Sequence, residues 1–330
     1  MNEAAANSLQ HVRLWRSRSV LGIGEAMVEF ATVGGDTYRR GFAGDTLNTC
    51  WHMAQILGPH ARVGYFTKVG TDGFSDQLIA FIEAGQMDAH RIVRDPERTL
   101  GLYVITLTEA ERHFTYWRER SAARYLADDV DGLVEATRDC GLINVSGITL
   151  AVIGDTGRRN LIDALRQARS AGAVVSFDPN VRMRLWRDAS ELREATQAML
   201  EVVDIALPSF DDEALIWGDT DPEATLTRLE HAGVPEIVVK NGPHEIVCSV
   251  GGERGRLRTP PIATIRDTTG AGDAFNSGYL AGRLLGMSPA ESCELGQKVA
   301  GEVIGHHGAL APKEALADIR DLLDQFNLNG

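Results

Sequence analysis

The sequence predicts an α/β fold in which helices cover both faces of a mostly parallel β-sheet. Short runs such as LINVSGI, AVVSFDPN and EIVVKNG are apolar at consecutive positions, so neither face of these strands is expected to meet water. Amphipathic helical segments, for example residues 155–171, separate these runs. Continuous Val, Ile and Leu strands that alternate with helices are typical of a parallel sheet covered on both sides. We therefore expect a doubly wound sheet flanked by helices.

Two hairpins interrupt this alternation in the first half of the chain. The segment VLGIGEAMVEF, residues 20–30, predicts a buried strand followed by an alternating one, and the GGD sequence at 34–36 predicts a turn into a third strand. Residues 99–118 contain two alternating strands around a polar TEAER turn. We expect these hairpins, over about residues 27–43 and 99–120, to form a small discontinuous β-strand lid beside the main sheet.

The remaining elements follow from apolar periodicity. A helix capped by Asp45 or Thr46 is expected to reach Leu57, because its apolar residues recur at intervals of three and four. Further helices are predicted at 75–84, 211–217, 289–304 and 312–326 and after Asp273, and short strands at 203–209, 256–262 and 262–266.

Net charge and cysteine distribution limit the classes of partner. The 330 residues include 33 basic and 46 acidic side chains, a net charge of −13. Such a chain repels polyanions, so we expect neither nucleic acid nor a membrane as its partner. The four cysteines stand far apart without a CxxC pair, which is typical of buried thiols in a reducing compartment and favours a cytoplasmic protein. Residues 1–18 lack the apolar core of a signal peptide, so we expect a flexible extension there.

The segment with the most specific chemistry is DTTGAGDAF, residues 267–275, a glycine-rich turn that opens into a helix. Glycines let a ligand approach the backbone, and the amides at a helix N-terminus bind anions such as phosphate. Asp273 lies in this positive region, where a carboxylate stays ionised and can accept a proton from an attacking hydroxyl. An acidic residue at a helix start also stabilises the helix without any chemistry. The neighbouring glycines favour the catalytic interpretation.

The longer segment DTTGAGDAFNSGYLAG resembles the signature of the ribokinase-like (PfkB-type) sugar kinases. It is distinct from a Walker A loop, because GxxxxGK[ST] is absent from the sequence. A second family segment, GDTLN at 44–48, lies where these kinases bind sugar hydroxyls, and the similarity extends from about Val20 to about Ile319. The resemblance implies a ribokinase-like kinase domain over residues 19–330 that uses ATP and Mg²⁺ to phosphorylate a sugar.

Within this family, several segments resemble the kinases of 2-keto-3-deoxygluconate. They are RGFAGDTLNT, GLY at 101–103, YWR at 116–118, VSGI at 145–148, FDPNVRMRLW and KNG at 240–242. This resemblance implies ATP-dependent phosphorylation of 2-keto-3-deoxy-D-gluconate to its 6-phosphate. Asp273 would be the general base, and the catalytic anion hole would consist of Gly270, Ala271 and Gly272. A kinase of fructose, ribose or a nucleoside, and a nonenzymatic nucleotide-binding regulator of the same fold, are the alternatives.

The resemblance also implies a set of sugar-binding residues. The expected contacts are Gly44, Asp45 and Asn48 for the sugar, Tyr103, Tyr116, Arg118 and Arg182 around its keto-acid end, and Asp178 at the end of the FDPN strand. Independently, an acidic chain needs fixed cations to hold an acidic sugar, and arginine binds a carboxylate through two parallel hydrogen bonds. Most arginines are instead solvated at the surface. Alternative cations are Arg39, Arg40, Arg112 and Arg184.

For the nucleotide, the family pattern implies contacts from Ser209, Lys240, Gly242, Thr268, Gly270 and Gly272. Lys240 ends an apolar strand, so a surface lysine with a buried stem is the alternative. Asp212 takes the place of the family's glutamate that organises Mg²⁺ through water, with a shorter side chain. The GIGEAM segment at 22–27 lacks the third glycine of a dinucleotide-binding loop, which disfavours an oxidoreductase. Since exposed strand edges need cover, we expect a homo-oligomer formed through the lid.

Overall fold

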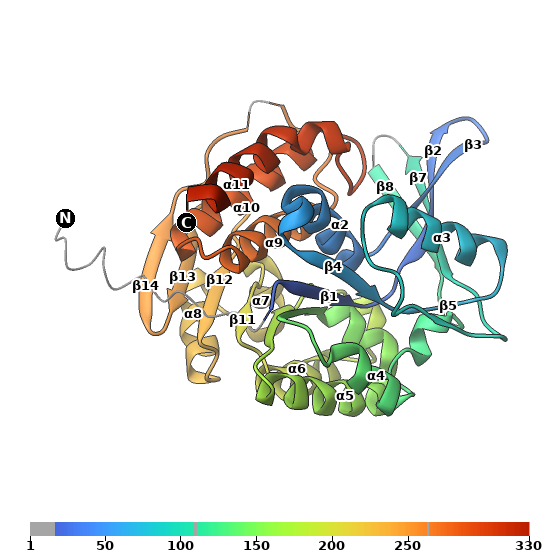
Figure 1. Cartoon of the computed structure of the whole chain (residues 1–330), viewed down its shortest axis with the longest axis horizontal. Helices are drawn as coiled ribbons and strands as arrows, with labels where there is room; N and C mark the ends of the chain where they lie inside the picture. Colours follow the sequence, from blue (N-terminus) through green and yellow to red (C-terminus); the bar gives the residue numbers. More distant parts are fainter. Residues whose placement is uncertain (1–16, 109–110, 263, 330) are drawn as a thin grey trace.

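The computed structural model describes residues 17–108, 111–262 and 264–329. Its largest element is an eight-stranded sheet in the order β14-β13-β12-β11-β10-β9-β1-β4 (Figure 1). The strands from β4 to β12 run parallel, and β13 and β14 add an antiparallel edge, which confirms the mostly parallel α/β fold. The strand bounds are Ser19–Ile23 (β1), Arg62–Phe66 (β4), Leu142–Ser146 (β9), Val174–Asp178 (β10), Ile205–Ala206 (β11), Glu236–Val239 (β12), Ile246–Val250 (β13) and Glu253–Leu257 (β14).

Both faces of the main sheet are buried, and its strands divide their side chains between two cores. Leu142 and Val174 belong to the core on one face, whereas the next residues, Ile143 and Val175, belong to the core on the other. Successive side chains of a strand point to opposite faces, so a strand covered on both sides has to be apolar at every position. This explains the uninterrupted apolar runs of the sequence.

One layer of helices covers each face of the main sheet (Figure 1). The first layer consists of α2 (Asp45–Leu57), α9 (Ala271–Leu284), α10 (Pro289–Ile304) and α11 (Ala317–Asn329). The second layer consists of α4 (Val130–Thr137), α5 (Gly147–Ser170), α6 (Ala189–Leu200), α7 (Phe210–Trp217) and α8 (Pro222–His231). Helices on both faces complete the doubly wound architecture.

A buried ion pair fixes α9 to the sheet. Arg283, near the end of α9, donates through Nε to Oε1 of Glu236 at the start of β12, at 2.9 Å, and both side chains are 3% exposed. Tyr279 Oη donates to the same carboxylate oxygen at 2.7 Å. A charge this deeply buried needs such partners, because its hydration is lost. The far end of α9 is thereby held while its first turn reaches the functional site.

The two hairpins join into one four-stranded sheet beside the main body. Its order is β3-β2-β7-β8, with β2 and β7 parallel, and its bounds are Met27–Gly34 (β2), Thr37–Ala43 (β3), Gly101–Thr108 (β7) and Glu111–Trp117 (β8). One face packs on helix α3 (Gly73–Ala84), where the rings of Phe42 and Phe81 lie 5.6 Å apart. The opposite face carries a separate cluster that includes Met27 and Tyr103.

Two helix starts differ from the expected ones. Helix α2 is capped by Gly44 rather than by Asp45 or Thr46, because Asp45 is already helical and its carboxylate accepts from the Thr46 amide. The helix expected from residue 155 is confirmed as the second part of α5, which is interrupted at the non-helical Gly154 (φ 67°, ψ −178°) and is preceded by a further helical segment that begins at Gly147, directly after β9. A positive φ interrupts a helix, and this break concealed the first turns from the periodicity argument.

The strands expected at 256–262 and 262–266 are largely wrong. Strand β14 ends at Leu257, and residues 258–262 and 264–266 are not in a strand. The amides of Arg266 and Asp267 both donate to the carbonyl oxygen of Ile304 at the end of α10. This segment therefore follows α10 toward the glycine-rich turn, because its hydrogen bonds are made with that helix and not with the sheet edge.

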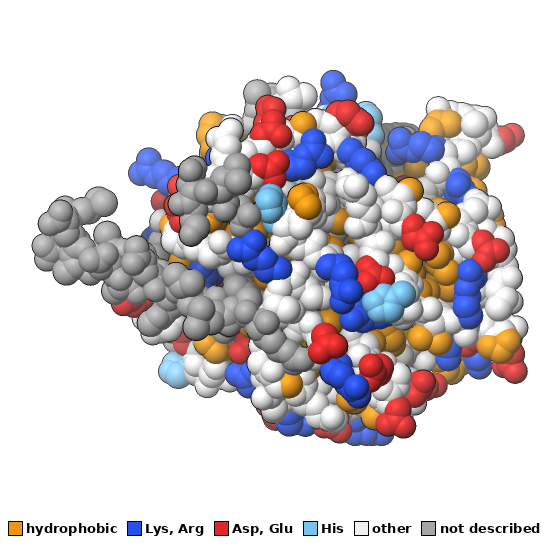
Figure 2. All heavy atoms as spheres, in the orientation of Figure 1, with side chains coloured by type: hydrophobic (Ala, Val, Ile, Leu, Met, Phe, Trp, Pro, Cys, Tyr) orange, Lys and Arg blue, Asp and Glu red, His pale blue; other side chains and the backbone are white. Residues whose placement is uncertain are grey.

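The expected N-terminal extension, residues 1–18, lies outside the described residues except for its last two positions. Residues 109–110, in the turn of the second hairpin, are outside them as well. As predicted, all four cysteines are buried. Among the helices that the structure describes, none is both long and apolar enough to cross a bilayer. Figure 2 shows basic and acidic side chains interspersed over the visible face.

Candidate active site

Three carboxylates from distant parts of the sequence meet where β9 and β10 end and α2 and α9 begin. Asp45 stands in the first turn of α2, Asp178 ends β10, and Asp273 stands in the first turn of α9. All three line one small cavity together with Thr46, Thr49, Asn144, Val145, Ser146, Asn180 and Asn276. Carboxyl ends of parallel strands are the usual ligand-binding edge of an open α/β sheet. The structure thus brings together three of the acidic residues singled out from the sequence.

Amide side chains orient two of these carboxylates. Asn48 Nδ2 donates to Asp273 Oδ2 at 2.8 Å, which joins the first turns of α2 and α9. Asn180 Nδ2 donates to Asp45 Oδ2, also at 2.8 Å, and its backbone has an unusual φ of 35°. Gly44 stands next to Asp45 without a side chain, because a Cβ there would lie 2.3 Å from the carbonyl oxygen of Glu25. The predicted sugar-binding segment at 44–48 therefore faces the aspartate of the glycine-rich turn.

Asp273 has a raised pKa. Burial is the largest cause, and the negative charges of Asp45 and Asp178 raise the pKa further. The hydrogen bond from Asn48 and the charge of Lys240 act in the opposite direction. The helix N-terminus alone favours an ionised carboxylate, but here burial and the two neighbouring carboxylates outweigh it. A raised pKa makes the Asp273 carboxylate a stronger proton acceptor once it is ionised.

The glycine-rich turn is held in one conformation. Gly270 has φ 75°, and a Cβ on it would lie 2.8 Å from the Cβ and 2.9 Å from the Cα of Ala309. The carboxylate of Asp267 accepts from the amides of Thr269 at 3.0 Å and Gly308 at 2.7 Å. The helical ladder begins with the bond from the Ala274 amide to the Gly270 carbonyl. The amides of residues 272 and 273 precede this ladder, which is the arrangement that binds anions.

Lys240 is buried beside this turn. Its Nζ donates to Asp178 Oδ2 at 2.6 Å and to Asn276 Oδ1 at 3.0 Å, and Asn276 Nδ2 donates to the same Asp178 oxygen at 2.6 Å. Lys240 is 8% exposed, so the alternative of a surface lysine is wrong. A Cβ on Gly272 would lie 3.5 Å from Nζ. An ammonium paired with the Asp178 carboxylate therefore stands next to the first turn of α9.

A larger cavity of about 540 Å³ lies on the other side of the turn. Its walls include the predicted nucleotide residues Ser209, Lys240, Gly242, Thr268 and Gly272, together with Ala271. Apolar side chains, among them Ile246, Ile265 and Phe275, form much of the rest. An apolar slot with a few polar groups at one end suits a flat base joined to phosphates. The two cavities share no lining residue, but Ala271 and Gly272 line the larger one and Asp273 in the same turn of α9 lines the smaller one.

Asp212 lies near Asp178, Arg182 and Lys240. Its Oδ2 accepts from the Val181 amide at 3.0 Å. Burial and the nearby Asp178 carboxylate raise its pKa, whereas Arg182 and Lys240 lower it. Within the described part of the chain, no group of three His, Cys, Asp or Glu side chains forms a ready metal site. A cation here would need ligands other than protein side chains.

The aromatic residues of the small sheet stack in a row. The rings of Tyr103 and Tyr116 lie 5.4 Å apart, and the Tyr103 hydroxyl donates to Glu29 on β2. Burial, followed by the Glu29 charge, raises the pKa of Tyr103. The guanidinium of Arg184, in the short helix η3 (Met183–Leu185), lies 3.9 Å from the centre of the Tyr116 ring. The stack thus connects the small sheet to the residues that follow β10.

The two arginines expected at a substrate carboxylate have different environments. Arg118 is 8% exposed and its Nη2 forms an ion pair with Glu25, which also accepts from Ser121 Oγ. Arg182 is exposed and donates through Nη1 to the carbonyl of Val181 at 2.7 Å. The sequence reasoning missed Glu25, although a charged residue inside the apolar GIGEAM run is a signal of a buried ion pair. It also missed Asn276 and Glu29.

The four alternative cations have different surroundings. The Arg112 side chain lies outside the described part of the structure. Arg40 lies over the Phe42 ring at 5.2 Å. Arg39 is exposed on β3 and approaches Gly308, where a Cβ would lie 3.6 Å from its Nη2. Arg184, through its contact with Tyr116, is the one of these that joins the aromatic row beside the predicted keto-acid residues.

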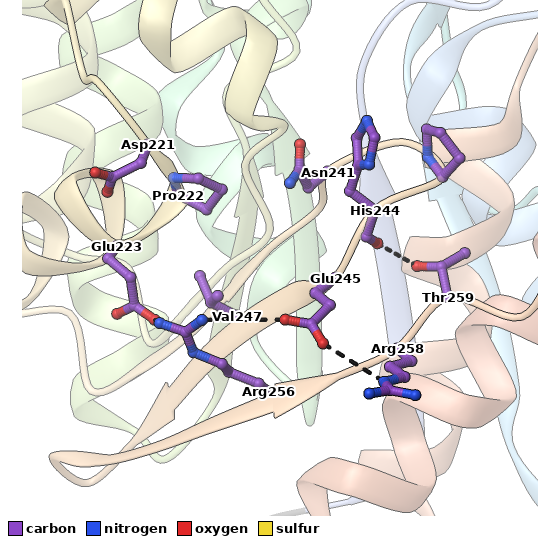
Figure 3. Close-up of a pocket in the computed structure, with 11 residues that line it drawn as sticks. Asp221, Pro222, Glu223, Asn241, His244, Glu245, Val247, Arg256, Arg258 and Thr259 are labelled. Atoms are coloured by element: carbon purple, nitrogen blue, oxygen red, sulfur yellow. Dashed lines mark hydrogen bonds and ion pairs between the residues drawn. The ribbon is translucent and has the colours of Figure 1, made fainter.

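Another hollow, of about 600 Å³, lies near β13 and β14 and shares Asn241, Pro243 and Thr259 with the cavity of about 540 Å³. In Figure 3, Glu245 points toward Arg256 and Arg258, with ion-pair distances of 4.0 and 3.8 Å. The two arginine side chains are 62% and 93% exposed. Ion pairs this exposed contribute little, so we assign this hollow no chemistry.

Comparison with known proteins identifies the family. The model of the pfkB family carbohydrate kinases matches residues 18–316. A 2-dehydro-3-deoxygluconokinase of Escherichia coli K12 is 39% identical over 308 residues, which is 91% of this chain and 99% of that protein. The enzyme of the same name from Haemophilus influenzae is 33% identical over 316 residues, which is 94% of this chain and all of that protein (100%).

Solved structures share the fold. A fructokinase with bound ATP from Xylella fastidiosa has a TM-score of 0.78 and 19% identity, covering 93% of this chain and 99% of that one. A 2-dehydro-3-deoxygluconokinase from Thermotoga maritima has a TM-score of 0.78 and 18% identity, covering 92% of this chain and 98% of that one. The expected ribokinase-like fold and the family resemblance are therefore confirmed. The chain belongs to the pfkB family of carbohydrate kinases and is an ATP-dependent sugar kinase.

Proposed function

We propose that this kinase phosphorylates the terminal hydroxyl of 2-keto-3-deoxy-D-gluconate, giving the 6-phosphate. The proposal is supported by the relatives from E. coli and H. influenzae, both named 2-dehydro-3-deoxygluconokinase and 39% and 33% identical to this chain. The observation that carries the chemistry is the position of Asp273. It lines a small polar hollow of about 10 Å³ and stands in the same first turn of α9 as Ala271 and Gly272, which line the large, mainly apolar cavity.

Proton transfer and charge stabilisation are assigned to α9 and the turn before it. Asp273, oriented by Asn48, takes the proton of the sugar hydroxyl as that oxygen attacks the γ-phosphorus of ATP. The backbone amides of residues 270–272 and that of Asp273 stabilise the charge on the transferring phosphoryl group. Asp45 holds a sugar hydroxyl, with its carboxylate kept in place by Asn180. Positioning by these groups supplies most of the rate enhancement.

The keto-acid end of the sugar is assigned to Tyr103, Tyr116, Arg118 and Arg182. Because Glu25 already balances the charge of Arg118, Arg118 contributes a fixed geometry more than a net charge. The net attraction for a carboxylate then comes from the exposed Arg182 and from Arg184, which is stacked on Tyr116. This division of roles makes selectivity for an acid depend on residues of the main body as well as of the small sheet.

The adenosine of ATP is assigned to the larger cavity, with Ser209, Gly242 and Thr268 at its polar end. Asp212 fits a role toward Mg²⁺, because a carboxylate whose pKa is raised by burial and a neighbouring carboxylate is stabilised by a nearby cation. Mg²⁺ keeps several waters and is held mainly by nucleotide phosphates, which agrees with a single protein carboxylate acting through water. When bound, the ion supplies neutralisation of phosphate charge.

The small sheet is assigned the role of a lid. It leaves the main sheet directly after β1, and the face with Met27 and Tyr103 carries the residues proposed to contact the sugar. Closure would exclude water and so limit hydrolysis of ATP. Its outer strands β3 and β8 have unpaired edges, and we propose that a second copy of the chain covers this sheet.

A substrate panel tests the proposed activity. ADP release is followed with 2-keto-3-deoxygluconate, its galactonate epimer, fructose and ribose, each with ATP and Mg²⁺. The proposal predicts the highest kcat/KM for a keto-deoxy acid. A higher kcat/KM for fructose or ribose would assign the chain to another sugar kinase of the same fold. No ADP release with any sugar would favour a regulator that only binds nucleotide.

A further inference from the structure

Lys240, Asp178 and Asn276 form a closed triangle of hydrogen bonds. The ammonium donates to Asp178 at 2.6 Å and to Asn276 at 3.0 Å, and the Asn276 amide donates back to Asp178 at 2.6 Å. The three residues are 8%, 7% and 2% exposed, respectively. They come from the end of β10, the residue after β12 and the second turn of α9. Three separate elements are therefore joined around one buried positive charge.

The triangle stands at the boundary of the two cavities. Asp178 and Asn276 line the small cavity that contains Asp273, whereas Lys240 lines the large one together with Gly272. The Nζ atom lies 3.5 Å from the position of a Gly272 Cβ, beside the amides assigned to the phosphoryl group.

The triangle needs a side chain at position 276 that both accepts and donates a hydrogen bond, as asparagine does. A lysine side chain is flexible, so two fixed acceptors are needed to hold its ammonium in one place. Asn276 uses its oxygen toward Lys240 and its NH₂ group toward Asp178, a combination that no carboxylate offers. An aspartate here would place two carboxylates in contact.

The charge of Lys240 also acts on Asp273. Asp273 is faced by Asp45 from α2, Asp178 from β10, Tyr103 from β7 and Lys240, and its pKa is lowered by Lys240 but raised by the two aspartates. Moving the ammonium away would therefore leave the two negative charges without compensation. Lys240 is therefore one influence on the pKa of Asp273, and it lowers a pKa that burial and the two aspartates raise.

We infer that Asn276 is a positioning residue: together with Asp178 it holds the Lys240 ammonium between Asp273 and the proposed nucleotide cavity, where that ammonium faces the transferring phosphoryl group. This inference rests on the proposed function. It assigns to Asn276 a role beyond anchoring α9, because its side-chain oxygen accepts from the Lys240 ammonium, which stands beside the amides that we assign to the phosphoryl group.

The test compares Asn276→Leu with Ser277→Ala. Leucine has a similar shape and makes neither hydrogen bond. Ser277 is the neighbouring buried residue on α9, and its hydroxyl bonds only to the Ala274 carbonyl of the same helix at 2.6 Å. We expect Asn276→Leu to lower kcat by about 10- to 100-fold, because small displacements of such groups are this costly. The KM for the sugar should change less than about threefold, since Asn276 is not expected to contact the bound sugar. Ser277→Ala should have the kcat and KM of the wild type.

Two readouts separate positioning from a structural role. In Asn276→Leu, the acid limb of the kcat/KM profile should move to higher pH, because the ammonium no longer favours ionised Asp273. In a Lys240→Met background, adding Asn276→Leu should lower kcat no further, because Asn276 acts through Lys240. Asn276→Ser, which keeps a hydroxyl acceptor, should give an intermediate kcat and replaces Asn276→Leu if that variant does not fold.

Wild-type kcat and pH profile in Asn276→Leu would overturn the inference. The inference would also be overturned if Asn276→Leu lowered kcat by the same factor in the Lys240→Met background as in the wild type, because the two residues would then act independently. These outcomes require an active wild-type enzyme. An inactive wild type on the whole sugar panel would instead count against the proposed function.

Discussion

Adding one methyl group at Gly270 or at Gly272 separates the folding of the glycine-rich turn from its chemistry. At Gly270, alanine would keep a left-handed φ of 75°, and its Cβ would lie 2.8–2.9 Å from Ala309. The left-handed conformation costs about 1–2 kcal/mol and overpacking about 1–3 kcal/mol. Gly270→Ala should therefore lose about 2–5 kcal/mol of unfolding free energy, together with its activity.

The matched substitution is Gly272→Ala, two residues further along the chain. It lies inside α9 without a positive φ, and an added Cβ would meet only Lys240 Nζ, at 3.5 Å. Alanine is the better helix former by up to about 1 kcal/mol, so stability should be unchanged or slightly higher. Turnover should fall, because the methyl group would occupy the approach of phosphate to the amides and to Lys240.

Urea unfolding followed by tryptophan fluorescence measures the first effect, and ADP release measures the second. A Gly270→Ala variant within about 0.5 kcal/mol of the wild type would show that the turn adapts and that the steric reasoning is wrong. A fully active Gly272→Ala variant would show that phosphate does not approach this turn.

Four further substitutions test other parts of the molecule. Asp273→Asn should lower kcat by about 10²- to 10⁴-fold with little change in sugar affinity, measured by calorimetry; unchanged turnover would reject the base. Because the pKa of Asp273 is raised and the base works only when ionised, kcat/KM should fall as the pH drops through that raised pKa, at a higher pH than for an ordinary aspartate. Arg182→Lys should lower kcat/KM for the keto-deoxy acid more than kcat/KM for fructose, and equal losses for both sugars would argue against a carboxylate site. Arg118→Lys should have the same effect and should also lower Tm, because it disturbs the ion pair with Glu25. Glu236→Gln should cost about 3–5 kcal/mol in urea unfolding, because it leaves Arg283 buried without a counter-charge, and a loss below about 1 kcal/mol would show that this ion pair is dispensable.

The sequence predicted the architecture because its signals are local. Apolar runs such as LINVSGI identified strands covered on both faces, and the two hairpins were recognisable from alternation and turn residues. The errors lie where a contact with another element replaced the local rule. The segment 262–266 looked like a strand, yet its end bonds to the last turn of α10. The first segment of α5, before Gly154, was not predicted, because the non-helical Gly154 separates it from the helix that the periodicity indicated.

The chemistry of the site divides in the same way. The sequence by itself determined that a glycine-rich turn opens a helix with Asp273 in its first turn, because turn geometry and helix starts depend on neighbouring residues. Only the tertiary structure decided that Arg118 is paired with Glu25 and that Lys240 is held by Asp178 and Asn276. It also reversed the expected direction of the Asp273 pKa. Burial and the charges that face a group depend on which strand ends and helix starts the sheet brings together, and no local pattern records that arrangement.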